Sequence, residues 1–284
     1  MNQSPILLPQ QVVSSNMAAG KVKTRLSLFR MILLGILAGM FIACGASASS
    51  VAMHAVSNVG LARFAAGAIF PVGLMMIIFV GGELFTGDCL MIMGCLQGRY
   101  TILSMVKVLV VVFLSNFLGA ALFAAMVSVS SQYDYTGGLL GAFTIKVAMG
   151  KLGLSFGAAF ISGILCNIFV CVAVLMSVAA KDISGKVWAI FFPIMAFVVS
   201  GYEHCVANMY YIPAGIFAAA NERYVQVAME TYGYTAQQLE ALNWGNMCLT
   251  NLLPVTLGNI VGGMVFVGLP LYLIHSAKIR AEEA

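Results

Sequence analysis

The stretch LFRMILLGILAGMFIACGASASSVAM (Leu28–Met53) contains one charged residue, Arg30. About 20 consecutive apolar residues are enough for a helix to cross a bilayer, so this stretch predicts a transmembrane helix. The remainder of the 284-residue chain has the same character, since 61% of its residues are hydrophobic and 8% are charged. Soluble proteins carry roughly 25% charged residues. Lipid is therefore predicted to be the main solvent of this protein.

Five further segments have the length and the apolar character of a membrane-spanning helix. With the first, they are Leu28–Met53, Phe64–Gly82, Ile102–Val129, Leu152–Ala180, Val187–Ala220 and Met247–His275. The fifth segment is too long for one straight crossing and has polar residues in its middle. The sequence therefore predicts an all-α, polytopic membrane protein with six transmembrane helices.

The basic residues predict how the helices are oriented. If the N-terminus is cytoplasmic, ten of the 14 Lys and Arg residues fall on the cytoplasmic side, and four fall outside: Arg63, Lys146, Lys151 and Arg223. Cytoplasmic connections carry an excess of positive charge, so both termini are expected in the cytoplasm of a multi-pass cell-membrane protein. We expect a cytoplasmic N-terminal segment over residues 1–27, one transmembrane domain over residues 28–276 and a cytoplasmic tail over residues 277–284.

The two halves of the chain resemble each other at three places. Gly35–Gly39 resembles Gly163–Asn167, Ser115–Ala120 resembles Gly258–Gly263, and Gly82–Thr86 corresponds to Gly201–His204. Because each half contains three spans, the halves must have opposite orientations. Inverted repeats with interrupted helices place binding sites near the membrane midplane in many transporters. Two inverted three-helix repeats are therefore predicted.

Two stretches interrupt the apolar pattern with glycines and ionisable residues. Gly81–Asp88 carries two carboxylates, and Ser200–Asn208 carries Glu203 and His204. Non-helical backbone at membrane depth must be buried in protein or line a cavity, and ionisable residues there mark pathways. Glu83 and Glu203 are interpreted first as paired anchors of two broken helices, with a role in a pathway as the alternative.

Three other polar residues lie in or beside the predicted spans. His204 sits at a break and can donate a hydrogen bond or exchange a proton near neutral pH. Lys151 begins the fourth span and serves either as an interfacial anchor or to attract anions, with Lys146 as a competing candidate. Asn167 is expected to join helices by hydrogen bonds.

Other functions find no support in the sequence. The seven cysteines form no C-x-x-C motif and the three histidines have no ligand spacing, so no metal site or disulfide framework is predicted. No phosphate-binding loop, dinucleotide-binding motif or zinc-protease motif is present. The basic residues are scattered, which does not favour nucleic acid as a partner. The sequence predicts a transport protein without a cofactor, and not an enzyme.

Four motifs resemble the formate/nitrite transporter family. They are ELFTG (Glu83–Gly87), GILCNIFVC (Gly163–Cys171), GYEHCVANM (Gly201–Met209) and NLLPVTLGNIVGG (Asn251–Gly263). The resemblance extends from the first span to the last. It implies a homopentamer in membrane lipid, with an aquaporin-like subunit that carries its own pore for formate, nitrite or hydrosulfide.

The resemblance also assigns residues to the pore. It implies that Thr86 faces a central His204 and that Lys151 is the lysine of a vestibule. Four polar residues would surround them: Asn167, Glu203, Asn208 and Asn259. Apolar constrictions are implied at Phe70, Leu74, Val170 and Phe197.

The transported solute stays open at this point. The long segment Asn221–Gly245 resembles formate channels, whereas Phe85-Thr-Gly-Asp88 resembles nitrite and hydrosulfide members of the family. Formate is the first choice of substrate, and nitrite or hydrosulfide is the alternative. The hypothesis includes proton-coupled transport through the central histidine. From another class, an aquaporin-like pore for neutral solutes is the alternative, although the chain lacks the two Asn-Pro-Ala repeats of aquaporins.

The charge distribution gives a first testable prediction. A single cysteine introduced within residues 232–238 of a variant lacking the reactive native thiols is expected to react with an impermeant reagent added outside the cell, because this segment lies on the side poor in basic residues. Thiol labelling of intact cells and of inverted vesicles measures this. Labelling restricted to the cytoplasmic face would contradict the predicted orientation.

Overall fold

The computed structural model describes residues 6–283, and within them the chain is helical without a named β-strand. Six helices are long and apolar enough to cross a membrane: Leu28–Met53, Val59–Val80, Ile102–Ser128, Phe156–Ala179, Ile183–Ser200 and Trp244–Ala277. The predicted all-α class and its six spans are confirmed. The second and fifth spans begin five and four residues earlier than the sequence predicted, and the fifth ends at Ser200.

The first half of the bundle consists of six helices. They are α2 (Leu28–Met53), α3 (Val59–Ile69), α4 (Val72–Val80), α5 (Phe85–Asp88), α6 (Ile92–Leu96) and α7 (Ile102–Ser128). Helices α3 and α4 together form the second span, and α5 continues after a break in the helix. Glycines let α2 and α7 approach closely, since a Cβ at Gly39 would lie 2.1 Å from the carbonyl oxygen of Asn116.

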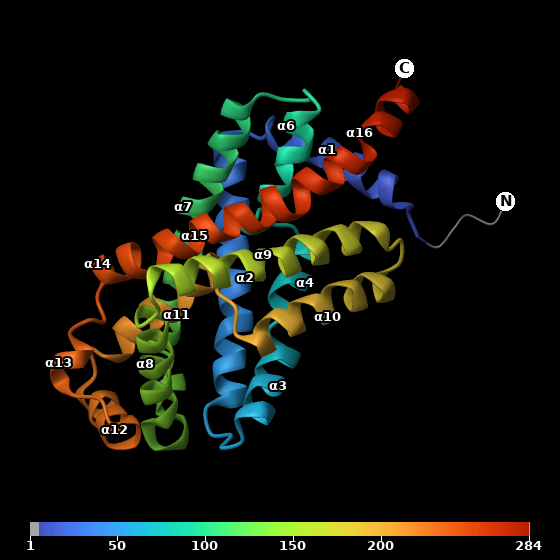
Figure 1. Cartoon of the computed structure of the whole chain (residues 1–284). Coiled ribbons are helices and arrows are strands. Elements are labelled where there is room, and N and C mark those ends of the chain that lie inside the picture. The colour runs from blue at the N-terminus through green and yellow to red at the C-terminus, as the bar shows by residue number, and fades with distance from the viewer. Residues whose placement is uncertain (1–5, 284) are drawn as a thin grey trace.

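The second half repeats this plan. Its helices are α9 (Phe156–Ala179), α10 (Ile183–Ser200), α11 (Cys205–Ala218), α14 (Trp244–Asn246), α15 (Leu253–Val261) and α16 (Leu269–Glu283), the last three joined by π-helical turns. Figure 1 shows α9 and α10 running side by side, with α15 and α16 forming one long rod beside α9. A Cβ at Gly258 in α15 would lie 2.1 Å from the carbonyl oxygen of Phe160 in α9.

Further helices form in segments that the sequence analysis treated as connections or as the N-terminal segment. They are α1 (Pro9–Lys23), α8 (Leu139–Leu152), α12 (Glu222–Tyr232) and α13 (Ala236–Leu239). Helix α1 buries Val12, Val13 and Met17 against residues near α6, α9 and α16. Helix α8 packs on α11. These helices were missed because they are shorter than a membrane span.

Both predicted interruptions are present as extended backbone inside the bundle. The first runs over residues 81–84 between α4 and α5, and the second over residues 202–204 between α10 and α11. Gly201 ends α10 with φ +74°, and a Cβ there would lie 2.3 Å from Arg63 Nη1. The left-handed backbone favours glycine at this position, because L side chains rarely adopt it, whereas the flexible Arg63 side chain could move aside.

A buried asparagine holds the first break. Asn116 of α7 accepts a hydrogen bond from the backbone N–H of Phe85 at 3.0 Å. Its amide nitrogen donates to the carbonyl oxygens of Gly35 (2.8 Å) and Glu83 (2.9 Å). One side chain thereby satisfies two backbone groups of the break and ties them to a carbonyl oxygen of α2.

Asn259 of α15 holds the second break with the same three contacts. It accepts from the backbone N–H of Cys205 (2.9 Å) and donates to the carbonyl oxygens of Gly163 (2.8 Å) and Glu203 (3.0 Å). These partners occupy the positions that the sequence repeats aligned with the first half. The correspondence between the halves is therefore carried by identical hydrogen-bond patterns.

Replacing Asn259 by Leu is expected to reduce the free energy of unfolding by on the order of 3 kcal/mol, because each buried polar group left without a partner costs about 1–3 kcal/mol. Asn116→Leu should cost a similar amount. Thermal unfolding of the purified protein measures both, with Gln237→Ala, at an exposed position, as the control. Midpoints equal to that of the control would contradict the anchoring role.

Candidate pore and selectivity site

A cavity of about 770 Å³ lies between α2, α3, α8, α10 and α11. Its wall includes Arg63, Lys146, Lys151, Tyr202, Glu203 and His204. The second helix break and three cationic side chains therefore line the same cavity. Such a charged wall concentrates anions from solution.

Lys151 does not begin the fourth span, as the sequence analysis expected, but lies near the C-terminal end of α8. Its ammonium is 2.9 Å from Glu203 Oε1, with 15% and 7% of the two side chains exposed. Asn251 Nδ2 donates to the carbonyl oxygen of Lys151 at 3.0 Å. The charge of Lys151 is therefore paired inside the protein and does not stand alone in the vestibule.

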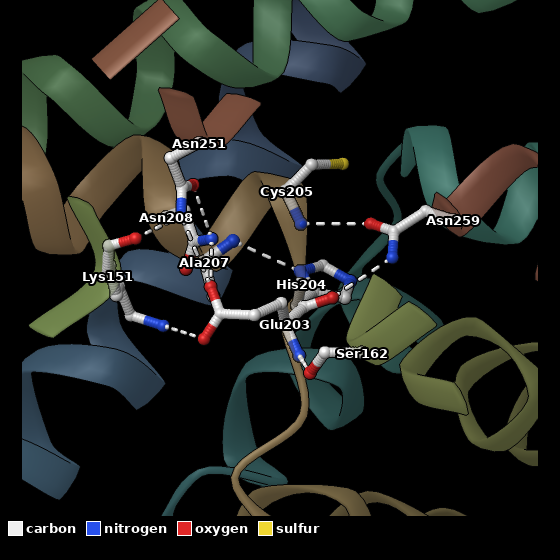
Figure 2. A network of polar contacts seen from close by, with 9 residues as sticks. All are labelled: Lys151, Ser162, Glu203, His204, Cys205, Ala207, Asn208, Asn251 and Asn259. Carbon is white, nitrogen blue, oxygen red and sulfur yellow. Dashed lines mark hydrogen bonds and ion pairs between the residues drawn. The ribbon is translucent and has the colours of Figure 1, made fainter. Parts of the chain in front are cut away.

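Glu203 is the centre of the polar network in Figure 2. Its second oxygen, Oε2, accepts from Asn208 Nδ2 at 2.6 Å, and Asn208 Nδ2 also contacts Asn251 Oδ1 at 2.7 Å. The backbone N–H of Glu203 donates to Ser162 Oγ at 3.0 Å. A buried carboxylate needs such partners to remain charged, so Glu203, Lys151 and Asn208 act as one unit.

His204 directly follows Glu203 and caps the start of α11. Its Nδ1 accepts a hydrogen bond from the backbone N–H of Ala207 at 3.0 Å, so Nδ1 carries no proton in this arrangement. The remaining nitrogen, Nε2, then carries the proton and donates to Thr86 Oγ at 2.9 Å. The imidazole is therefore neutral here, and the hydroxyl proton of Thr86 is free to point toward a solute.

Asn167 of α9 joins the two breaks. Its side-chain amide donates to the carbonyl oxygens of Thr86 (3.1 Å) and Asn259 (2.7 Å). Cys171, one turn later, also directs its thiol to the carbonyl of Thr86 at 3.5 Å. The Thr86–His204 pair is thus supported from behind by buried side chains.

An apolar constriction surrounds His204. A cavity of about 10 Å³, room for about one water molecule, is lined by His204 together with Phe70, Leu74, Val170, Phe197, Leu84, Ile42 and Ile194. The rings of Phe70 and Phe197 meet edge to face at 5.5 Å. The first four apolar residues are the ones implied by the family resemblance.

Sequence reasoning missed Leu84, Ile42 and Ile194 in this constriction. Leu84 had a signal, because it follows Glu83 just as His204 follows Glu203 in the other repeat. Ile42 and Ile194 carry no signal that separates them from other apolar residues in their helices.

Of the two competing lysines, Lys146 has no carboxylate partner among the described residues and lies 4.5 Å from the ring centre of Tyr232.

A second lysine–carboxylate cluster was also missed. Lys23 at the end of α1 contacts Glu83 Oε2 (2.6 Å) and Asp88 Oδ1 (2.5 Å). Lys23 lies 12 residues before Gly35, and Lys151 lies 12 residues before Gly163, so the repeats place them equivalently. The signal was present in the spacing, but Lys23 was considered only as an orientation charge.

Comparisons with known proteins show to which family the chain belongs. The sequence profile described as Formate/nitrite transporter matches residues 10–273. The chain belongs to the formate/nitrite transporter family. Members of this family and the structural neighbours are channels or transporters and not enzymes.

Matches to individual relatives cover most of this chain. A probable formate transporter of Methanothermobacter thermautotrophicus is 35% identical over 91% of this chain and 93% of its own. The formate channel FocA of Haemophilus influenzae is 39% identical, and the match covers 74% of this chain and 73% of that channel. A solved pentameric formate channel with formate bound has 33% identity and a TM-score of 0.77, covering 87% of this chain and 97% of its own.

The buried ion pair of this transporter gives the third prediction. Lys151→Met is expected to lower the free energy of unfolding by about 3 kcal/mol or more, because it leaves Glu203 charged and unpaired. Lys151→Met combined with Glu203→Gln should recover much of that loss. Thermal unfolding of the single and double variants measures the coupling.

The matched control for that experiment is Lys146→Met. Its cation–π contact with Tyr232 is worth about 0.5–1 kcal/mol at an exposed site, so this variant should unfold close to wild type. Equal losses of unfolding free energy for Lys151→Met and Lys146→Met would contradict a stabilising buried pair. Strictly additive losses for the Lys151 and Glu203 substitutions would also contradict it.

Proposed function

We propose that this protein is a channel for small monovalent weak-acid anions in the cell membrane, with formate as the first substrate. The observation that carries the proposal is the 2.9 Å hydrogen bond between His204 and Thr86, which joins two helix breaks inside an apolar constriction. A polar pair isolated among aromatic and aliphatic side chains suits a small solute with one or two hydrogen-bonding atoms. Nitrite and hydrosulfide are the alternatives of the same chemical class.

Anions would collect in the vestibule before they reach the constriction. Arg63 and Lys146 have no carboxylate partner among residues 6–283, and they line the cavity together with the paired Lys151. The potential of such a wall acts over about 8 Å at physiological ionic strength. It raises the local concentration of anions outside the constriction without binding them permanently.

Passage through the constriction is expected to require loss of charge. Desolvating an unpaired anion among Phe70, Leu74, Val170 and Phe197 is costly. A weak acid avoids this cost when its anion takes up a proton from water in the vestibule, crosses as the neutral acid and releases the proton to water on the other side. Thr86 and His204 would then hydrogen-bond the solute, with Asn167 and Asn259 holding them in place.

The proposal includes the assembly and the orientation. A homopentamer in membrane lipid, with both termini cytoplasmic, would place the vestibule toward the outside and α1 toward the cytoplasm. The names of the relatives, which include formate transporters and channels, support formate over the two alternatives. A pore for neutral solutes would gain nothing from cations around its mouth, so it is less well supported.

The fourth prediction concerns His204. In liposomes, wild-type protein is expected to carry formate faster as the pH falls, and His204→Phe should lose that pH-dependent component. The reason is that protonation of His204 would break its Nδ1 contact with Ala207 and add an anion-attracting charge, which phenylalanine cannot do. Formate, nitrite, hydrosulfide and glycerol fluxes measured against pH test the substrate class at the same time.

The control for this experiment is His54→Phe, because His54 lies at the vestibule mouth and bonds the Thr136 hydroxyl instead of the constriction. It should retain the wild-type pH profile. Identical profiles for wild type and His204→Phe would reject the protonation role, and glycerol flux without anion flux would favour the neutral-solute pore.

A further inference from the structure

The two repeats build equivalent polar clusters with different charges. On one side of the Thr86–His204 pair, Lys151 contacts Glu203, and Asn208 completes the group. On the other side, Lys23 contacts Glu83 and Asp88. Asp88 lies five residues after Glu83, as Asn208 lies five residues after Glu203.

This replacement of an amide by a carboxylate changes the charge balance. One ammonium and one carboxylate cancel in the Lys151 cluster. With every carboxylate ionised, the Lys23 cluster would have one ammonium and two carboxylates, which leaves one negative charge in excess. The two carboxylates are sheltered from water, since 11% of the Glu83 side chain and none of the Asp88 side chain is exposed.

One carboxylate oxygen of the Lys23 cluster is in a position to take up a proton. Asp88 Oδ1 contacts Lys23, whereas Asp88 Oδ2 is buried without a hydrogen-bond partner among the described residues. A buried acceptor without a donor is costly, and two neighbouring carboxylates resist simultaneous ionisation. A proton on the pair removes both difficulties, because it neutralises the excess charge and supplies a donor.

We propose that Glu83 and Asp88, bridged by Lys23, form a binding site for one exchangeable proton on the α1 side of the pore. The proton comes from water on that side and returns to it, and no bond other than O–H forms or breaks. When the site is occupied, the cluster is neutral like the Lys151 cluster. When it is empty, its negative charge, two residues from Thr86, repels anions that approach from the α1 side.

The other titratable groups near the cluster do not replace this role. Tyr100, with Arg99 beside it, approaches the cluster from the segment before α7. Cys89 and Cys171 interact with Asp88 from its own segment and from α9. Phenols and thiols ordinarily titrate at about 10 and 8.5, and arginine remains charged. A change near neutral pH in this cluster is therefore assigned to the carboxylate pair.

Infrared difference spectroscopy of purified protein, without substrate, tests the site directly. Wild-type protein in neutral buffer is expected to show the carbonyl band of one buried protonated carboxylic acid, which disappears in alkaline buffer. Asp88→Asn should lack the band, because the remaining Glu83 is then paired with Lys23 as Glu203 is with Lys151. Asp134→Asn, at an exposed carboxylate paired with Arg223, is the control and should keep it.

A second variant covers the case in which Asp88→Asn does not fold. Lys23→Met removes the ammonium that stabilises the ionised pair, so its band should persist into more alkaline buffer than that of wild type. A missing band in wild type, an unchanged band in Asp88→Asn, or a Lys23→Met band lost at the wild-type pH or lower would overturn the proposal.

The consequence for transport rests on the proposed function and is measured separately. Making the α1 side alkaline should reduce anion flux from that side several-fold in wild type but not in Asp88→Asn. Unchanged fluxes in the presence of the expected band would remove only the repulsion step. Absence of any anion flux would reject the proposed function and leave the spectroscopic result valid.

Discussion

The structure depends on satisfying broken backbone inside the membrane. Two helices stop near the centre of the bundle, and the lipid interior offers no water to the N–H and C=O groups that they expose. Asn116 and Asn259 solve this problem in the same way, each with one accepted and two donated hydrogen bonds. Since each break is fixed by a side chain from another span, the polar centre and the helix packing are determined together.

Fixing the breaks also determines the electrostatics of the pore. The extended segments bring Glu83 and Glu203 into protein, where an isolated charge would be unstable. Each glutamate is therefore accompanied by a lysine that comes from outside the two broken helices, Lys23 from α1 and Lys151 from α8. These short helices, which do not span the membrane, are needed to neutralise charges that the spanning helices bury.

The sequence was sufficient for the spans, the breaks and the family, for physical reasons. A span needs a long apolar run, and a break needs glycine and polar residues in such a run, so both leave marks within one local stretch. Contacts between distant stretches leave weaker marks. The pairing of Lys151 with Glu203 crosses 52 positions, and nothing local distinguishes Lys151 from Lys146, which instead lies over Tyr232. Helix α8, which presents both lysines, is too short to be recognised as a span.

The differences between the repeats locate the specific chemistry better than their similarities do. The anchoring asparagines are the same in both halves because both breaks have the same backbone groups to satisfy. The halves differ at positions after the two glutamates. Leu84 lines the constriction in the first half, and its counterpart in the second half is His204. Asp88 in the first half corresponds to Asn208 in the second. A fully symmetric pore would present the same environment from both sides and could not distinguish them. One repeat places the His204 imidazole at the constriction, and the other places an additional carboxylate, Asp88, near it. The two approaches to Thr86 therefore differ in polarity although they share one scaffold.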